Sequence, residues 1–308
     1  MSSESEAEKD SELTGTTPDS GARAGVVMVL FAGVFWSLQG VTIRFIDDAA
    51  SSQVVFWRAV SQCLTLLIII AVINRGRVVH AFRTAGIAGI CGGVCGLGAG
   101  TSFVFALHHT TVATVMFIMA SSPLFAALLA WLIMRERLDR ATLVSMLVAM
   151  TGIGIMVSEG FAGGGLLGYA FSLACTICFA GIAVVARWGR GVSMMPGTWL
   201  GAFMTVPFAF WLSSGSVTIP LDEVGYSFIS GGLLTAIGAT LFLLGAKYVA
   251  AGVLAFLTLT EIVLAPIWVL WVFNEVPSGH TLAGGVVVLT ALLIEGIRQA
   301  RSIGRNKA

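Results

Sequence analysis

The sequence predicts an all-helical, multi-pass membrane protein with ten transmembrane helices in two inverted five-helix repeats and both termini in the cytoplasm. Composition gives the first indication, since 57% of the residues are hydrophobic and only 11% are charged. A soluble domain carries roughly 25% charged residues, and its helices need a polar face towards water. The other two indications are the spacing of apolar runs and the distribution of basic residues along the chain.

Ten uncharged or nearly uncharged runs follow one another along the chain. A helix rises 1.5 Å per residue, so about 20 apolar residues cross a hydrocarbon core about 30 Å thick. The second run contains Arg58 and the ninth contains Glu261. The predicted spans are 25–43, 54–73, 84–107, 110–134, 141–158, 163–186, 194–213, 224–246, 248–274 and 276–294.

Basic residues indicate the orientation of these spans. When ten helices are threaded alternately, 15 of the 17 Lys and Arg residues fall on the side that holds both termini, and only Arg44 and Arg58 fall on the other. Short basic loops stay in the cytoplasm. The basic residues are therefore topology signals rather than a nucleic-acid surface, and we expect a protein of the bacterial cytoplasmic (inner) membrane.

The ends of the chain and its cysteines predict little further chemistry. Residues 1–21 are acidic and are typical of a disordered cytoplasmic tail, without the order of a signal peptide, and residues 301–308 form a basic tail. All five cysteines fall inside predicted spans, which argues against a disulfide framework. Cys175 and Cys178 form a CxxC, but no histidine on that span completes a metal site. We expect no cofactor and no metal.

A weak internal repeat divides the chain near residues 160–168. The predicted repeats are 22–160 and 161–300, each with five helices, so the second enters the membrane from the opposite face. When helices four and nine are aligned at one constant offset in residue number, several identical residues coincide. These pairs are Phe117 with Phe256, Ala126 with Ala265, and Glu136 with Glu275.

Several short motifs carry a family resemblance. They are W36-S37-x-Q39 followed by Arg44, F56-W57-R58, SSPLFAALLAWLIMRERL at 121–138 and TEIVLAPIWVLWVFNEVP at 260–277. Over about 22–300, the chain resembles the EamA-domain members of the drug/metabolite transporter superfamily. The resemblance implies that helices 1, 3, 4, 6, 8 and 9 surround a central cavity and that transport proceeds by alternating access. The sequence departs from the family after this tryptophan. Family members commonly carry a small residue followed by glycine there, whereas here Ser37 is followed by Leu38.

Glu261 is the strongest single candidate for chemistry. It lies near the middle of the run 248–274, where a lipid-facing carboxylate would cost several kcal/mol. The side chain should therefore face the bundle interior, and we expect it to bind substrate or to couple proton movement to transport. The alternative is a hydrogen bond that only joins helices.

Arg58 and a group on the first span form the rest of the candidate binding site. Arg58 either snorkels to the outer interface or makes a structural pair, or it binds a substrate carboxylate or pairs with Glu261. Trp36 and Gln39 share a helix face and, with Ser37, offer a stacking wall and a polar handle; packing is the alternative. Ser122 completes the set of candidate substrate-binding residues.

Candidate gating or hinge positions are two prolines and two glutamates. Pro123 and Pro266 are expected to kink their helices. Glu136 and Glu275 follow helices four and nine, and they either act as a hinge or latch or cap polar helix ends beside Arg135, Arg137 and Thr281.

These observations predict a carrier of a small organic solute. We expect an exporter of an amino acid or related metabolite, with proton exchange as a candidate driving force. The alternatives are a carrier of quaternary ammonium or other cationic compounds, and a membrane scaffold or sensor without transport. No nucleophile–base pair or metal cluster supports an enzyme. The expected partners are the small-molecule substrate, protons and the lipid bilayer, in a monomer or homodimer, with no nucleic acid.

Overall fold

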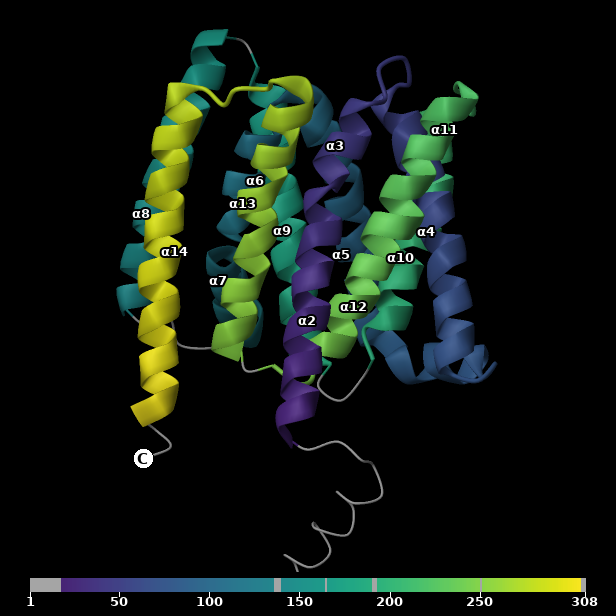
Figure 1. Ribbon diagram of the computed structural model, residues 1–308, viewed down its shortest axis with the longest axis horizontal. Helices are drawn as coiled ribbons and strands as arrows, with labels where there is room; N and C mark the ends of the chain where they lie inside the picture. The colour runs from purple at the N-terminus through teal and green to yellow at the C-terminus, as the bar shows by residue number, and fades with distance from the viewer. Residues whose placement is uncertain (1–17, 136–139, 164, 190–192, 250, 306–308) are drawn as a thin grey trace, which may run out of the picture.

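A computed structural model describes residues 18–135, 140–163, 165–189, 193–249 and 251–305. Within these ranges the chain consists of helices and short connections, with no strand (Figure 1). The helices are α2 (Pro18–Ser37), α3 (Gln39–Arg44), α4 (Ser51–Ile73), α5 (Val78–His109), α6 (Val112–Ala120), α7 (Ser122–Met134), α8 (Arg140–Gly163), α9 (Leu166–Trp188), α10 (Met195–Leu212), α11 (Leu221–Phe228), the π-helix η1 (Ile229–Ile237), α12 (Gly238–Gly245), α13 (Ala251–Phe273) and α14 (Gly279–Arg305).

The predicted all-helical membrane fold is confirmed, whereas the number of spans is only partly supported. Seven helical segments of the described chain are long and apolar enough to cross a membrane, and the bent pair α6 and α7 makes an eighth. Helices α10 and α13 coincide with the predicted spans 194–213 and 248–274 but do not meet that criterion. The count of ten therefore stays a prediction.

Both described ends of the chain lie at the same end of the bundle, at the start of α2 and the end of α14 (Figure 1). This arrangement agrees with an even number of crossings, while the cytoplasmic side stays a prediction. Helix α2 begins at Pro18, so the helix starts before the predicted end of the N-terminal tail at residue 21. Likewise, α14 continues to Arg305, inside the predicted C-terminal tail.

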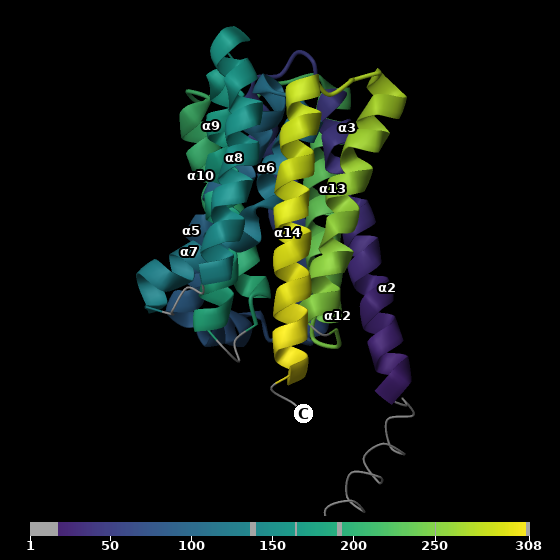
Figure 2. The same cartoon turned by 90° about the vertical axis from the view of Figure 1, so that its left-hand side faces the viewer.

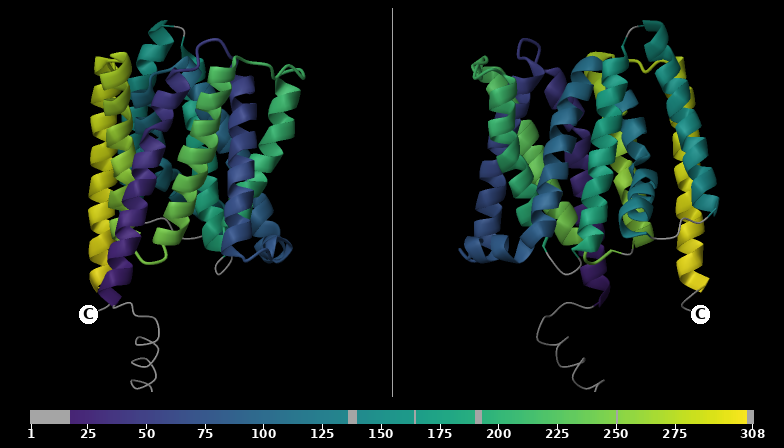
Figure 3. Two further views of the ribbon diagram at one scale, coloured as in Figure 1. Left: turned by 45° about the vertical axis from the view of Figure 1, so that its right-hand side comes forward. Right: turned by 180° about the vertical axis from the view of Figure 1, so that it is seen from behind.

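The helices are arranged with two pairs at the edges and the rest between them. Helices α8 and α14 pack together at one edge (Figure 2), and α4 and α10 pack together at the opposite edge (Figure 3). Helices α5 and α9 pack between these edges, as do α6 and α13. The buried apolar residues of α5 and α6 form much of the largest core cluster. The interior between the edges is therefore built mainly from helices that the family resemblance places around a cavity.

Helix ends repeat along the chain at the offset predicted from the sequence. Four helix ends in the first half recur in the second half at the offset that relates Phe117 to Phe256. Assigned helix ends generally vary by one or two positions. The matching boundaries are Ile73 with Leu212, Val112 with Ala251, Met134 with Phe273, and Arg140 with Gly279. The same register thus extends well beyond the residue identities that suggested it.

Left-handed backbone conformations follow the same offset. Non-glycine residues with positive φ are uncommon, and the described chain has four of them. They form two pairs, and a pair of glycines accompanies the first. The pairs are Arg75 (φ 49°) with Ser214 (φ 53°), Arg135 (φ 55°) with Asn274 (φ 54°), and Gly76 (φ 80°) with Gly215 (φ 79°). The same turns are therefore built twice.

Contacts between the halves are reciprocal, as an inverted repeat requires. Helix α5 packs on α9. In the second half, α12 is equivalent to part of α5, and it packs on α2, which is equivalent to α9. In the same way, α5 packs on α10 and η1 packs on α4. The pairs α4 with α10, α6 with α13 and α8 with α14 each match a helix to its own counterpart. The repeat limits at 160 and 161 stay a prediction.

Close packing of η1 on α4 fixes the position of Arg58. A Cβ atom added to Gly231 would collide with the Arg58 backbone, including its carbonyl carbon at 2.8 Å. Backbone atoms cannot rotate away as a flexible side chain can, so only glycine fits without a shift of one helix against the other.

We expect Gly231→Ala to lower the free energy of unfolding by about 1–3 kcal/mol, because it overpacks this contact. Gly225→Ala in the adjoining α11 is the matched control, since a Cβ there meets no atom within 4 Å. The control should be neutral or stabilise by up to about 1 kcal/mol, the usual helix preference for alanine. Thermal unfolding in detergent measures both, and equal stability of the two variants would contradict the packing described here.

Candidate functional site

Arg58 of α4 lies in the bundle interior, with only 6% of its surface exposed. Its Nε donates to Ser230 Oγ at 3.2 Å, and its Nη2 donates to Thr235 Oγ1 at 2.9 Å and to Gln39 Oε1. The guanidinium also lies 5.5 Å from the centre of the Phe103 ring, within range of a cation–π interaction. The snorkelling alternative is therefore wrong for Arg58, because its partners hold the charge inside the bundle.

The π-helix η1 positions the two hydroxyl partners of Arg58. Thr235 Oγ1 lies 2.7 Å from the carbonyl of Ser230, five residues earlier, and 2.9 Å from Gln39 Oε1. A five-residue spacing matches the wider turn of a π-helix, which frequently marks functional sites. Sequence reasoning missed Ser230 and Thr235. The only signal was the Gly231–Gly232 pair, which allows η1 to approach α4 closely.

Glu261 of α13 is half-buried and faces the interior. Cys175 of α9 is buried in the same interior. Cys175 Sγ also lies 3.8 Å from Met119 Sδ. Within the described chain, no ion pair joins Glu261 to Arg58, so that predicted alternative is absent from this conformation.

The first-span candidates make different contacts on either side of Leu38, where α2 ends and α3 begins. Trp36 is half-buried and packs against Phe242 of α12, with ring centroids 5.3 Å apart. Ser37 is fully buried and accepts a hydrogen bond from Trp268 Nε1 at 3.0 Å. Gln39 instead belongs to the Arg58 cluster. Ser37 and Trp36 therefore make packing contacts with α13 and α12 in this structure, and their role in binding stays a prediction.

The chain bends beside one of the two prolines that were expected to kink their helices. Helices α6 and α7 meet at an angle of 42° around Ser121, and Pro123 lies in the first turn of α7. Pro266 lies within α13, which is assigned as one helix through it, so the kink expected there stays a prediction. Ser122 begins α7 and is half-buried. At the offset that relates the two repeats, Ser122 corresponds to Glu261, so the two candidates occupy equivalent places.

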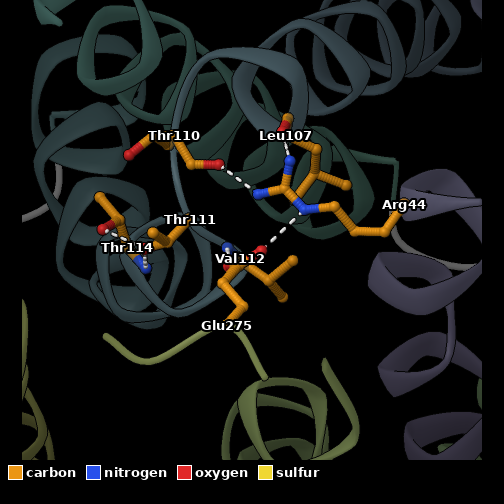
Figure 4. A network of polar contacts seen from close by, with 7 residues as sticks. All are labelled: Arg44, Leu107, Thr110, Thr111, Val112, Thr114 and Glu275. Atoms are coloured by element: carbon orange, nitrogen blue, oxygen red, sulfur yellow. Dashed lines mark hydrogen bonds and ion pairs between the residues drawn. The ribbon is translucent and has the colours of Figure 1, made fainter. Parts of the chain in front are cut away.

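A polar network closes the end of the bundle that is predicted to face outward (Figure 4). Glu275 Oε2 forms an ion pair with Arg44 Nε at 2.8 Å, and Glu275 Oε1 accepts from the Val112 backbone N–H at 2.7 Å. Arg44 also donates to the carbonyls of Leu107 and Thr110, both at 2.7 Å. Sequence reasoning therefore missed Arg44 as the partner of Glu275. The signal that could have found it is that Arg44 is one of only two basic residues on the side predicted to face outward.

The expected neighbours of Glu275 are otherwise engaged. Thr281 bonds to Ser278 and to Thr114, so the predicted placement of Glu275 beside Thr281 is corrected to a pair with Arg44. Glu136, the other predicted gate residue, lies outside the described residues.

No metal centre competes with this interior cluster in the described part of the chain. There, no group of three or more His, Cys, Asp or Glu side chains is placed to hold a metal ion. A surface pocket of about 370 Å³ lies at the α4–α5 turn and is lined by Ile73, Asn74, Arg75, Arg77 and His80. It is open, at the end of the bundle, and distant in the fold from Arg58.

The chain is similar to known transporter proteins. Residues 23–158 match the EamA-like transporter family. Solute carrier family 35 member G1 of Homo sapiens is 22% identical over 294 residues, covering 89% of this chain and 79% of that protein. Pseudopaline exporter CntI of Pseudomonas aeruginosa (strain UCBPP-PA14) is 25% identical over 288 residues, covering 88% and 95%.

A solved structure, described only as "Crystal structure of protein", shares the fold. It superimposes with a TM-score of 0.60 at 16% sequence identity, and the match covers 88% of this chain and 96% of that one. The family resemblance seen in the sequence is confirmed by these matches and by the helical architecture. The chain is a multi-pass membrane protein, and its residues 23–158 match the EamA-like transporter family.

Proposed function

We propose that the protein is a secondary transporter that exports a small zwitterionic solute, an amino acid or related metabolite, by alternating access around the Arg58–Glu261 centre. The observation that carries this proposal is the buried guanidinium of Arg58, which has only neutral hydrogen-bond partners, together with a Glu261 carboxyl on α13 that is paired with no cation in the described structure. A solute with its own carboxylate and ammonium groups complements that arrangement. The relative named as an exporter supports the direction.

Arg58 has donors to spare for a carboxylate. A guanidinium carries five N–H donors, and within the described chain its hydrogen bonds use only Nε and Nη2. Nη1 lies beside Gly100, where an added Cβ would be 3.8 Å away. Its neutral partners orient the guanidinium without neutralising it. A buried cation without a carboxylate partner is costly, so we infer that the substrate carboxylate supplies the missing charge.

Glu261 serves the opposite end of the solute. Its carboxyl group makes no hydrogen bond or ion pair in the described structure, and it lies on α13, a different helix from Arg58 on α4. A carboxyl in such a place accepts either an ammonium group or a proton. Alternate occupancy by substrate and proton would couple their movement in opposite directions, which is the proposed basis for proton-driven export.

A second candidate function is transport of quaternary ammonium or other cationic compounds. The observation that favours it is the difference between the two groups, since Arg58 already has three hydrogen-bond partners and Glu261 has none in the described chain. In that case Glu261 alone would be the counter-charge, and Arg58 would hold η1 against α3 and α4.

Flux measurements on purified protein in liposomes test both functions. A panel of zwitterionic amino acids, their amides, the matching amines and quaternary ammonium compounds is offered with and without a pH gradient. We expect protein-dependent movement of compounds that carry both charges. Movement of amines and quaternary compounds alone would favour the second candidate, and no movement of any compound under either gradient would reject both.

A further inference from the structure

The network around Arg44 and Glu275 joins three segments that are far apart in sequence. Arg44 is the last residue of α3, Leu107 and Thr110 lie at the α5–α6 turn, and Glu275 lies in the connection from α13 to α14. Only Glu275 comes from the second half of the chain. Its ion pair with Arg44 and its hydrogen bond to Val112 are therefore contacts between the two halves (Figure 4).

The groups that these side chains bind are helix ends. The last carbonyls of a helix and its first N–H groups have no partner within the helix. Arg44 satisfies carbonyls at the C-terminal end of α5, and Glu275 accepts from the first N–H of α6. Both pairings also match the helix dipoles, since a cation is favoured at a C-terminus and an anion at an N-terminus. The network therefore holds the α5–α6 turn against α3 and α13.

Each helix held by this network also leads to the interior centre. Gln39 lies on α3, five residues before Arg44, and Phe103 lies one turn before Leu107 on α5. Glu261 lies on α13, about 18 Å from the end of that helix at 1.5 Å per residue. Helix α6 leads from Val112 to the bend at Ser121. The network therefore lies at the outer ends of the helices that carry the residues of the interior centre.

Exposure of the ion pair is consistent with a contact that opens. The side chains of Arg44 and Glu275 are 25% and 18% exposed, so water can solvate both charges when the pair separates. The chain also contains a polar network of similar size that is built differently. Glu295 of α14 accepts from Thr142 and Ser145 of α8 and from Arg298, and its side chain is only 5% exposed. That network joins an edge pair of helices and encloses no interior centre.

We propose that Arg44 and Glu275 form the outer gate of the transport path, and that this structure is the state closed at that end. The gate holds the helices carrying Gln39, Phe103 and Glu261 together, and release of a solute to the outside requires the pair to separate. The assignment of a path rests on the proposed function. The contacts between the halves, and their rupture on opening, do not depend on which solute moves.

Amide hydrogen exchange of the full-length protein in lipid nanodiscs, read by mass spectrometry, tests the gate without a substrate. Glu275→Gln keeps an acceptor for the Val112 N–H but removes the ion pair, and Arg44→Met removes the donors to Leu107 and Thr110. In both variants we expect exchange to rise about tenfold in residues 39–44 and 116–120, because local opening sets the exchange rate. Residues 140–158 of α8 should be unchanged.

Glu295→Gln is the matched control, because it disrupts the α8–α14 network instead. It should raise exchange in residues 140–158 and leave 39–44 and 116–120 unchanged. A local helix cap would affect only the first turn of α6, so an increase confined to residues 112–115 in the gate variants would overturn the proposal. Increased exchange in a protein that moves no solute would sustain the gate and reject the proposed function.

Discussion

Replacing Arg58 with methionine is expected to reduce solute flux at least 100-fold while changing the free energy of unfolding by no more than about 2 kcal/mol, because two opposing terms largely cancel. Loss of the three hydrogen bonds leaves buried polar partners on Gln39, Ser230 and Thr235 unsatisfied, at about 1–3 kcal/mol each for a group that finds no other partner. Exchange of the buried charge for an apolar side chain also removes its desolvation penalty, which is several kcal/mol per ion.

The remaining polar partners limit the loss, because Thr235 Oγ1 still has Gln39 Oε1 and the Ser230 carbonyl within reach. Flux is measured in liposomes and unfolding by a thermal ramp in detergent. Arg83→Met, at an exposed position of α5, is the control for loss of an arginine as such. Flux that survives in Arg58→Met, together with a large drop in stability, would show that Arg58 holds helices and does not bind solute.

Replacing Glu261 with glutamine is expected to abolish flux driven by a pH gradient, by 100-fold or more, with little loss of stability. Glutamine is close in shape to a protonated carboxyl but cannot bind or release a proton, so any coupling through this position must stop. Stability should be nearly unchanged because the carboxyl has no partner to lose in the described structure. A residual, uncoupled flux down a solute gradient is the expected remainder.

Glu295→Gln again supplies the comparison, since it removes a buried carboxylate that has partners. It should lower stability, because charged hydrogen bonds contribute about 1.5–3 kcal/mol each, and it should leave the pH dependence of flux intact. Should Glu261→Gln transport normally yet unfold at a lower temperature, the carboxyl would be a helix–helix contact, and proton coupling would have to arise elsewhere.

Features set by local geometry and by the bilayer could be predicted from the sequence. The apolar runs fix where helices lie because a span has a required length, and the polar turns fix where they end. The constant offset between the halves, suggested by sparse identities such as Phe117 with Phe256, recurs in the turns at Arg75 and Ser214 and in the boundaries of α6 and α13. An interior position for Glu261 followed from the cost of a charge among lipid tails.

Features that depend on contacts between distant helices could not be predicted in the same way. The partners of Arg58 come from α3 and η1, and the π-helical turn arises where Gly231 packs on the α4 backbone. The two prolines differ for a similar reason. Pro123 lies in the first turn of α7, where its missing N–H has no cost, and the chain bends there. Pro266 lies inside an unbroken α13, where neighbouring helices decide the outcome.

The central claim is that Arg58 and Glu261 together recognise one solute from its two ends, and equilibrium binding to purified protein tests it most directly. An amino acid that binds the wild-type protein is compared with its amide and its decarboxylated amine. Arg58→Met should make the amino acid bind no better than the amine. Glu261→Gln should remove the gain in binding affinity that the ammonium group of the solute contributes. If both variants bind the amino acid with wild-type affinity, the two residues do not form the binding site, and the account of this interior centre is wrong.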